Sequence, residues 1–393
     1  GIRMKRAIAA LLLLAALCAG VLARAETVGF GSINADAVNI RKSAGGDLIF
    51  RAEQGQNVFI SGSETDAKGQ EWYRVVIYRR PVQNGSRREG WVMAKFVDVT
   101  DADSRNITKV ALNDNGYMAL HADGTVSGAE VGFYDSEEMT QRFAGLSGVR
   151  DIGVGLRTYA AAKEDGALWQ WGIRKLLDGD QPYTELPVRL IASDTVDGCV
   201  FVTDTEVLLG GGRPDESRYL FEPAGMPHAS EVAQAACFGP FVLLLNTQGE
   251  LSAGTIDTMG EIPLDLGKRT ELLRTEGDWT GLSRVDICKS AAGSRLAWDN
   301  MRLIGARIDG TAIAWPETLQ AQVADWTGLT DVKLGAAFAL GLREDGMVLC
   351  AGDEKIAAQV RGWENVASIE AAETYCAAVT EDGRILFAGQ IKE

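Results

Sequence analysis

The segment LREDGMVLCAG, residues 342–352, leads from an apolar run through Asp345 and Gly346 into a second apolar run. A near-copy, VTEDGRILFAG, occupies residues 379–389, and related segments begin at residues 120, 162 and 245. Asp and Gly adopt the positive φ of tight hairpin turns at low cost, so each copy predicts two antiparallel strands joined by a turn. The repetition indicates that one structural unit recurs along the chain, and this recurrence decides the fold.

Alignment on the turn position predicts seven repeated units with a spacing of roughly 40 residues. The turn positions are Gly124, Gly166, Thr205, Gly249, Gly310, Gly346 and Gly383. The residues before each turn are apolar on both alternating sets, as in FVLLLN at 241–246, which is typical of strands buried on both faces. Sheets with two apolar faces must pack on neighbours, and a closed ring leaves no such face exposed. We therefore expect an all-β fold with a seven-bladed β-propeller over residues 106–393.

Dipeptides that follow the turn in several units support a specific resemblance. They are Trp171-Gly172, Ala351-Gly352 and Ala388-Gly389. Together with the Asp-Gly turns and the apolar strands before them, they resemble the regulator of chromosome condensation repeat, and more closely its bacterial relatives. The resemblance covers about residues 106–390 and implies a propeller. Nucleotide exchange on a small GTPase, the role of the eukaryotic member, is not carried over, because the repeats are divergent and lack the histidine that often follows the first strand.

Residues 26–100 differ from the repeats and precede them, with residues 101–105 as a linker. Short runs rich in Val, Ile and aromatic residues alternate there with Gly, Asn and Asp turns, which predicts a small β-barrel of about five strands. The motifs are NADAVNIR at 34–41, EWYRV at 71–75 and GWV at 90–92. In this order they resemble the bacterial Src-homology-3-like (SH3-like) domain. The resemblance implies a domain that binds cell-wall peptidoglycan or wall-linked peptides.

Aromatic side chains of this barrel are candidate ligand contacts, because they stack on sugar faces and peptide planes. The candidates are Trp72, Tyr73 and Trp91. The alternative is that they form the core, which is common in a barrel of this size. Trp72 and Tyr73 are adjacent on one strand and point to opposite faces, so only one of them can face outward with ease.

Four arginines surround the tip of a barrel hairpin: Arg79, Arg80, Arg87 and Arg88. Guanidinium groups form strong paired hydrogen bonds with anionic groups, so these residues are candidate contacts to an anionic wall polymer. A solvated hairpin explains the same four charges. Both interpretations stand at this point.

Variable stretches between the repeats are expected to form loops on the propeller rim, where a rigid ring presents them to a protein partner. The candidate partner-binding aromatics are Phe133, Tyr134, Tyr183, Tyr219 and Phe221. The alternative is that these side chains tuck back over the blade edges. Tryptophans at repeated positions, such as Trp279, Trp326 and Trp363, are expected to pack between blades.

Residues 1–25 have the pattern of a secretory signal peptide. A basic start precedes an apolar run of about 15 residues and then Ala23-Arg24-Ala25, a small-x-small cleavage site. The run is short of the ~20 residues that span a bilayer, so a retained membrane helix is the weaker alternative. Lipidation at Cys18 is also weaker, because Leu17 replaces the small residue that such a signal needs. We expect a secreted or envelope-associated bacterial protein with no membrane span after cleavage.

Charge and side-chain chemistry argue against several classes of function. The net charge is −15, and removal of a leader that has basic but no acidic residues makes it more negative, which opposes binding to nucleic acid. His121 and His228 lack metal-ligand spacing, and no GxSxG or phosphate-loop motif is present. Five of the six cysteines follow the leader without a CxxC motif and are expected to be small buried thiols, with an incidental disulfide as the alternative. We expect no catalytic, cofactor or metal site, and hence no enzyme.

These features predict a secreted, non-enzymatic binding protein of the bacterial cell envelope. Its barrel would tether it to cell-wall material, and its propeller loops would recognise a protein partner. The alternative is an extracellular enzyme inhibitor, because a secreted propeller of this family resembles the proteinaceous β-lactamase inhibitors, which plug an active site with aromatic loops. A polysaccharide-active enzyme would need two carboxylates about 5–10 Å apart in a cleft, for which the sequence has no motif.

Overall fold

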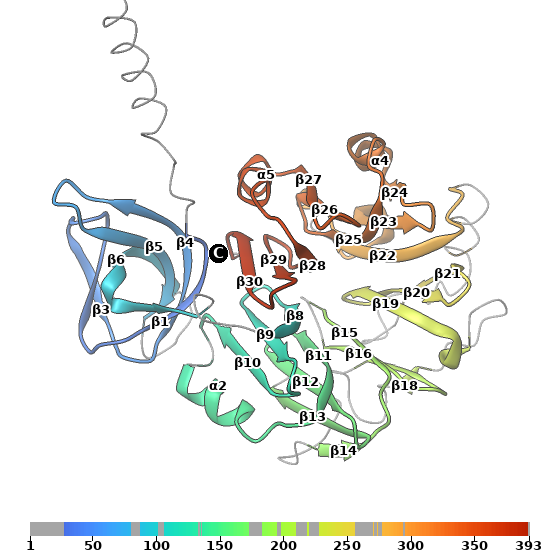
Figure 1. Cartoon of the computed structure of the whole chain (residues 1–393), viewed down its shortest axis with the longest axis horizontal. Coiled ribbons are helices and arrows are strands. Elements are labelled where there is room, and N and C mark those ends of the chain that lie inside the picture. The colour runs from blue at the N-terminus through green and yellow to red at the C-terminus, as the bar shows by residue number, and fades with distance from the viewer. Residues whose placement is uncertain are drawn as a thin grey trace, which may run out of the picture.

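The structure is a computed structural model of the chain. It describes residues 27–79, 87–100, 106–132, 134, 136–172, 183–194, 198–209, 218–219, 228–255, 270, 273, 277–293 and 295–391. The expected signal peptide and the linker 101–105 lie outside these residues. The described chain forms one curled sheet at its N-terminal end, followed by a ring of small sheets (Figure 1).

Seven antiparallel strands form the N-terminal sheet, in the order β3-β2-β6-β5-β4-β1-β7. They are β1 (Gly29–Ile33), β2 (Val38–Arg41), β3 (Leu48–Ala52), β4 (Asn57–Thr65), β5 (Glu71–Tyr78), β6 (Arg87–Met93) and β7 (Val97–Val99), with the 3-10 turn η1 (Ala94–Phe96) before β7. The sequence predicted about five strands, because a segment as short as β7 leaves no alternating pattern to detect. Residues on the inner face, among them Ile40, Ile60 and Ile77, pack into an apolar core.

Small antiparallel sheets make up the rest of the described chain, and we number them 1 to 7 in chain order. Sheet 1 contains β8 (Ile107–Leu112), β9 (Gly116–His121) and β10 (Val126–Glu130); sheet 2 contains β11 (Val149–Gly155), β12 (Thr158–Lys163), β13 (Ala167–Gly172) and β14 (Tyr183–Glu185). Sheet 3 contains β15 (Leu190–Ala192), β16 (Val200–Val202), β17 (Val207–Leu209) and β18 (Arg218–Tyr219); sheet 4 contains β19 (Val232–Phe238), β20 (Phe241–Asn246) and β21 (Leu251–Thr255). Sheet 5 contains β22 (Leu282–Lys289), β23 (Met301–Arg307) and β24 (Ala312–Trp315); sheet 6 contains β25 (Leu329–Leu334), β26 (Phe338–Arg343) and β27 (Val348–Gly352). Sheet 7 contains β28 (Val366–Ala371), β29 (Tyr375–Thr380) and β30 (Ile385–Gly389).

These sheets stand around a common centre and close into a ring (Figure 1). The first strand of each sheet contacts the first strand of the next, and β28 of sheet 7 contacts β8 of sheet 1. Apolar side chains fill the spaces between neighbouring sheets, as Leu303 and Val332 do between sheets 5 and 6. The all-β, propeller-like architecture that the repeats predict is therefore confirmed at this level.

The repeated turns have the conformation that the sequence predicts and also join neighbouring sheets. Gly346 has φ 80°, and the Asp345 carboxylate accepts the backbone N–H of Met347 at 3.1 Å. The carbonyl of this glycine accepts the N–H of Val366, the first residue of the next sheet, at 3.0 Å. Gly383 does the same for Ile107 at 3.0 Å, so the last turn closes the ring onto the first sheet.

Short helices between sheets were not expected from the sequence. They are α2 (Ser136–Phe143), α4 (Glu317–Val323) and α5 (Glu354–Val360), which contact the outermost strands β10, β24 and β27 respectively. Each buries two apolar residues one turn apart, such as Ile356 and Val360 of α5. Segments of seven or eight residues contain too few helical turns for a clear periodic signal in the sequence. In the fold these helices cover the outer edges of sheets, which would otherwise be exposed to solvent.

A β-bulge recurs in the first strand of the described sheets, with sheet 3 as the exception. The shifts fall between Ile107/Lys109, Val149/Asp151, Val232/Gln234, Leu282/Arg284, Leu329/Asp331 and Val366/Ser368. At the bulge, the hydroxyls of Thr108, Ser283 and Thr330 each donate to a carbonyl of the facing strand at 3.2 Å. These hydroxyls satisfy a backbone carbonyl beside the disturbed ladder.

The cysteines that follow the leader are free thiols. Cys199, Cys237, Cys288 and Cys376 are buried, and Cys350 is partly buried. Burial raises the pKa of the Cys350 thiol to about 12, so the thiolate form is disfavoured. The prediction of small buried thiols is confirmed for the four fully buried residues.

Candidate functional site

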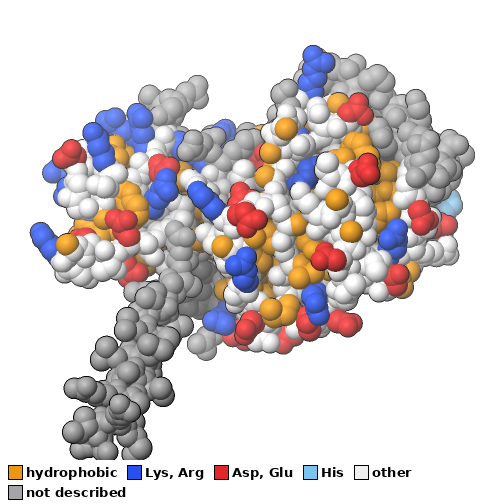
Figure 2. Space-filling model, turned by 90° about the horizontal axis from the view of Figure 1, so that it is seen from above, with side chains coloured by type: hydrophobic (Ala, Val, Ile, Leu, Met, Phe, Trp, Pro, Cys, Tyr) orange, Lys and Arg blue, Asp and Glu red, His pale blue; other side chains and the backbone are white. Residues whose placement is uncertain are grey.

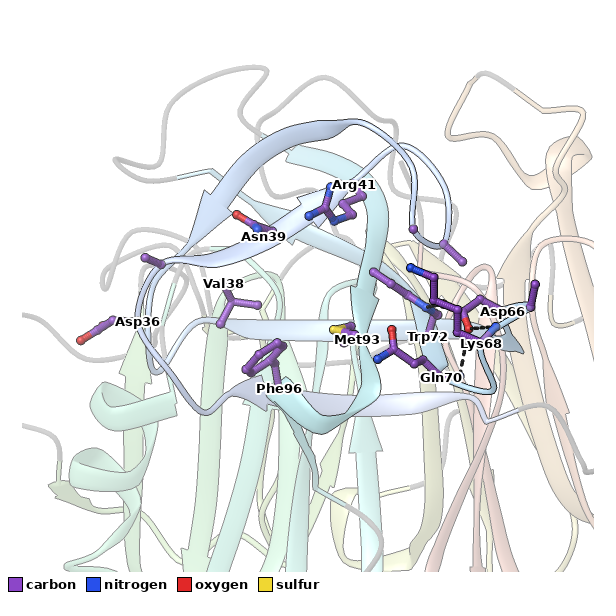
Figure 3. A pocket seen from close by; sticks show the side chains of 14 residues that line it. Asp36, Val38, Asn39, Arg41, Asp66, Lys68, Gln70, Trp72, Met93 and Phe96 are labelled. Atoms are coloured by element: carbon purple, nitrogen blue, oxygen red, sulfur yellow. Dashed lines mark hydrogen bonds between the residues drawn. The ribbon is translucent and has the colours of Figure 1, made fainter.

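A cavity of about 560 Å³ lies among residues of β2, β5, β6, η1 and the adjoining turns of the N-terminal sheet (Figure 3). Its apolar lining includes Val38, Trp72, Met93 and Phe96. Its polar lining includes Asp36, Asn39, Arg41, Asp66, Lys68 and Gln70. An apolar floor with a few polar groups around it is the usual composition of a ligand-binding site, so we take this cavity as the candidate site.

Strand alternation positions the aromatic side chains of this site. Trp72 of β5 lies opposite Met93 of β6 in the antiparallel register, and both line the cavity. The next residue, Tyr73, points to the other face of β5 and packs against the inner core of the sheet. The prediction that Trp72 and Tyr73 face opposite sides is confirmed. Tyr73 is partly buried against this core, and its role as a ligand contact stays a prediction.

Asp66 fixes the loop that covers one end of the cavity (Figure 3). Its Oδ1 accepts the backbone N–H groups of Lys68 and Gln70, both at 2.9 Å. Its Oδ2 accepts the indole Nε1–H of Trp72 at 2.9 Å, which fixes the ring orientation of a side chain that is 4% exposed. The hydrogen bond from the Gln70 backbone, followed by that from Trp72, lowers the pKa of Asp66, so the carboxylate stays ionised. Asp66 therefore orients Trp72 and is a poor proton donor at neutral pH.

Charges of both signs stand around the cavity. Arg41 donates from Nη1 to the carbonyl of Gly46 at 2.7 Å, and the Lys95 ammonium lies 4.9 Å from the ring centre of Phe96. Asp36 accepts the backbone N–H of Gln54 through Oδ1 at 3.4 Å. Together with Lys68, these groups can pair with the carboxylates and amines of a peptide-like ligand.

The other candidate residues of this sheet lie outside the cavity. Trp91 is half-buried on β6, between Arg41 of β2 and Arg74 of β5 in the register, next to the cavity lining. Arg79 and Arg88 are exposed, and Arg87 is half-buried. None of these three described arginines lines the cavity. Arg80 lies outside the described residues.

Tyr134 corrects one expectation about the rim aromatics. Its side chain is 8% exposed and packs against Trp171, with ring centroids 4.1 Å apart, and against Tyr159. Burial raises the pKa of the Tyr134 hydroxyl to about 12. Tyr134 belongs to the apolar cluster between sheets 1 and 2, and so it is not a surface anchor.

The remaining rim candidates are not described at side-chain level. Tyr183 and Tyr219 are placed in the backbone of β14 and β18, and their side chains lie outside the described part of the structure. Phe133 and Phe221 also lie outside it. Trp279, Trp326 and Trp363 are buried in apolar clusters between neighbouring sheets, as the sequence predicts.

A second group of polar side chains bridges the first strands of neighbouring sheets near the ring centre. The Lys109 ammonium of β8 pairs with Asp151 of β11, and the Gln234 amide of β19 exchanges hydrogen bonds with the backbone of Val285 at 2.8 and 2.9 Å. Asp286 of β22 accepts the Leu334 N–H of β25 at 2.7 Å. Since each bridge satisfies groups on two sheets, these residues hold neighbouring sheets of the ring together.

Sequence reasoning missed several cavity residues, notably Lys68, Gln70, Met93 and Phe96. A signal was present in the segment DAKGQ at 66–70, an Asp-to-Gly turn directly before Trp72. Met93 could be reached from Trp91 by strand alternation, once the register of β5 and β6 was known. Phe96 lies in a 3-10 turn that carries no periodic pattern.

Comparison with known proteins shows propeller-like neighbours at low similarity. The ectodomain of the Physcomitrella patens receptor kinase CR4 is 13% identical, with 72% of this chain and 73% of that chain covered and a TM-score of 0.46. The CRINKLY WD40 ectodomain of the Arabidopsis thaliana receptor kinase ACR4 is 12% identical, with 71% and 95% covered and a TM-score of 0.45. No protein-family model and no curated protein matches the chain. Among the described residues, no helix is long and apolar enough to cross a membrane.

Proposed function

We propose that this chain is a secreted, non-enzymatic binding protein of a bacterial cell envelope. In this proposal the N-terminal sheet is an SH3-like barrel, the ring is a seven-bladed propeller, and the cavity beside Trp72 holds the ligand. The observation that carries the proposal is the cavity of about 560 Å³, with its aromatic and thioether floor and its charged rim. The leader pattern of residues 1–25 supports export from the cytoplasm.

A wall-linked peptide is the ligand class that suits this cavity best. Phe96 is partly buried and offers its ring to the flat groups of a peptide, while Trp72 is buried beneath the cavity as part of its apolar lining. Lys68 and Asp36 offer charges to the carboxylates and amines of the peptide. Basic side chains gather on the N-terminal sheet in the face shown in Figure 2, with some acidic ones among them, whereas side chains of both signs are dispersed over the ring. In a chain with a net charge of −15, this makes the N-terminal sheet the part best suited to an anionic polymer.

The ring would present its connecting segments to a protein partner. A closed ring of packed sheets is rigid, and connections on its outside are free to vary without loss of the core. This part of the proposal keeps Phe133, Tyr183, Tyr219 and Phe221 as candidate contacts and omits the buried Tyr134. The alternative hypothesis, an extracellular enzyme inhibitor, relied on the same aromatic residues. Tyr134 is therefore no longer a candidate contact in that hypothesis either.

Sedimentation with purified peptidoglycan tests the ligand assignment. Residues 26–393 are expected to pellet with it, and Lys68→Ala and Phe96→Ala are each expected to weaken binding about tenfold, as loss of one ion pair or one aromatic contact does. Lys355→Ala, which replaces an exposed lysine of α5 that does not line the cavity, serves as the matched control and should bind like the unaltered chain. Equal binding by all three variants, or none by the unaltered chain, would exclude the cavity as a peptidoglycan site.

A further inference from the structure

The ring has one seam, between sheet 1 and sheet 7, where the two ends of its chain meet. The described strands of sheet 1 come from residues 107–130 and those of sheet 7 from residues 366–389, so these two neighbouring sheets, unlike the others, are not consecutive along the chain. Hydrogen bonds do cross it, including those from the Tyr375 hydroxyl to the carbonyls of Asn113 and Gly116, both 2.7 Å. The seam therefore lacks the covalent continuity that each other junction has.

Short helices fill the outer side of other junctions. Helix α4 contacts β24 of sheet 5 and β27 of sheet 6, and α5 contacts β27 and β30 of sheet 7. Helix α2 contacts β10 of sheet 1, and its Phe143 meets Trp169 of sheet 2 with ring centroids 5.9 Å apart. Each helix thus acts as a wedge that buries apolar side chains between the outer strands of two sheets.

The N-terminal sheet occupies the corresponding place at the seam. Strand β1 contacts both β10 of sheet 1 and β30 of sheet 7, and β4 contacts β10 (Figure 1). Phe30 of β1 is fully buried and lies 5.1 Å from the ring of Tyr117 in sheet 1 and 5.3 Å from the ring of Phe387 in sheet 7. Phe59 of β4 lies 5.7 Å from the ring of Tyr375. Phe30 therefore bridges both sides of the seam, and Phe59 adds a contact with sheet 7.

Hydrogen bonds and close packing also join the N-terminal sheet to α2 and to the segment that follows β10 of sheet 1. The backbone N–H and the hydroxyl of Ser136 donate to the carbonyl of Gly55 at 3.2 and 2.9 Å. Tyr78 lies so close to Gly132 that a Cβ added there would stand 2.7 Å from its ring. The fit is tight enough to leave no room for a side chain at Gly132.

We propose that the N-terminal sheet is a clasp that holds the ring closed, replacing at the seam the helical wedge found at other junctions. Along β5, Trp72 lines the cavity, while Val76 belongs to the apolar cluster at the seam. The clasp and the cavity thus use different parts of the same sheet, and the cavity stays open while the clasp is engaged. The sheet is a structural part of the ring, in addition to any ligand it binds.

Hydrogen exchange of the full chain tests the clasp. Phe30→Ala is expected to speed amide exchange about tenfold or more in sheets 1 and 7, because a void at the seam favours local opening there. Sheets 4 and 5, on the far side of the ring, should be unchanged. Ile356→Ala in α5 is the matched control, and it should act on sheets 6 and 7 and leave sheet 1 protected. Phe30→Leu, a milder change, provides the same readout if the alanine variant does not fold.

Cleavage of the connection gives a second readout that needs no ligand. A protease site placed within residues 101–105 allows the sheet to be cut from the ring after folding. The clasp predicts that the two pieces elute together and that sheets 1 and 7 keep their protection. Separation of the pieces with sheets 1 and 7 still protected would overturn the proposal, and so would faster exchange in Phe30→Ala confined to residues 27–100.

Discussion

Two aspartates show how local surroundings decide what a carboxylate does in this protein. Asp66 is at the surface, and hydrogen bonds from Gln70 and Trp72 lower its pKa. Asp286 lies between the first strands of sheets 5 and 6, and burial raises its pKa to about 7 despite the nearby Lys333 ammonium. The nearby Glu370 raises it further. Asp66 is therefore a stable anion, whereas Asp286 titrates close to neutral pH.

The raised pKa of Asp286 makes the stability of the ring depend on pH. The folded state holds the proton up to about pH 7, while the unfolded state releases it near the ordinary Asp value of 3.8, so stability falls as pH rises between these values. Asp286→Asn keeps an oxygen for the Leu334 N–H and carries no charge. Relative to the unaltered chain, it is expected to gain up to about 4 kcal/mol in free energy of unfolding between pH 4 and pH 8. Urea unfolding across this range measures the gain, and a pH-independent difference would contradict it.

Elements of the ring could be predicted where neighbouring residues in the sequence determine the conformation. Hairpins formed at the Asp-Gly positions because Gly124, Gly310 and Gly346 provide a positive φ, and their residue types are readable in the sequence. The Thr205 copy also forms a turn, in which the Thr203 hydroxyl accepts the N–H groups of Thr205 and Glu206. Helices α2, α4 and α5 were missed because their burial depends on edge strands contributed by other segments.

Substitution of two turn glycines distinguishes the cost of backbone strain from the cost of a steric clash. Gly166 has φ 86° with nothing within 4 Å of an added Cβ, whereas Gly383 has φ 79° and its Cβ would lie 2.5 Å from the backbone N of Asn106. Gly166→Ala is expected to cost about 1 kcal/mol from the left-handed conformation alone. Gly383→Ala should cost about 1–2 kcal/mol more, because it also pushes sheet 7 from sheet 1. Urea unfolding of both variants measures the difference. Equal losses of unfolding free energy would show that the backbone at the seam shifts to accept the added methyl group at no cost.

The whole molecule is built as one packed unit at the level of its core. Phe30, Phe59 and Val76 of the N-terminal sheet share an apolar cluster with Tyr117 of sheet 1 and Tyr375 of sheet 7. The sequence suggested a linker between two modules, since the composition changes at residues 101–105. The core that the N-terminal sheet shares with sheets 1 and 7 depends on contacts between residues up to hundreds of positions apart, and no local sequence pattern predicts such contacts.

Shared packing predicts that the N-terminal sheet and the seam unfold together. Hydrogen exchange at increasing temperature should show peptides from residues 27–100 losing protection over the same interval as those of sheets 1 and 7. An isolated small domain would instead lose protection at its own temperature. Loss of protection in residues 27–100 well before sheets 1 and 7 would therefore contradict a common core.

The sequence by itself determined the repeated hairpin, the positions of its turns and the need for sheets to stack. These are local properties: Asp and Gly favour the turn, and strands apolar on both faces cannot remain exposed. Only the tertiary structure decided that Tyr73 and Tyr134 face inward, that Trp72 lines a cavity, and that Phe30 closes the ring. Whether an aromatic side chain is core, ligand contact or clasp depends on which distant strands surround it, and that is fixed only when the chain has packed.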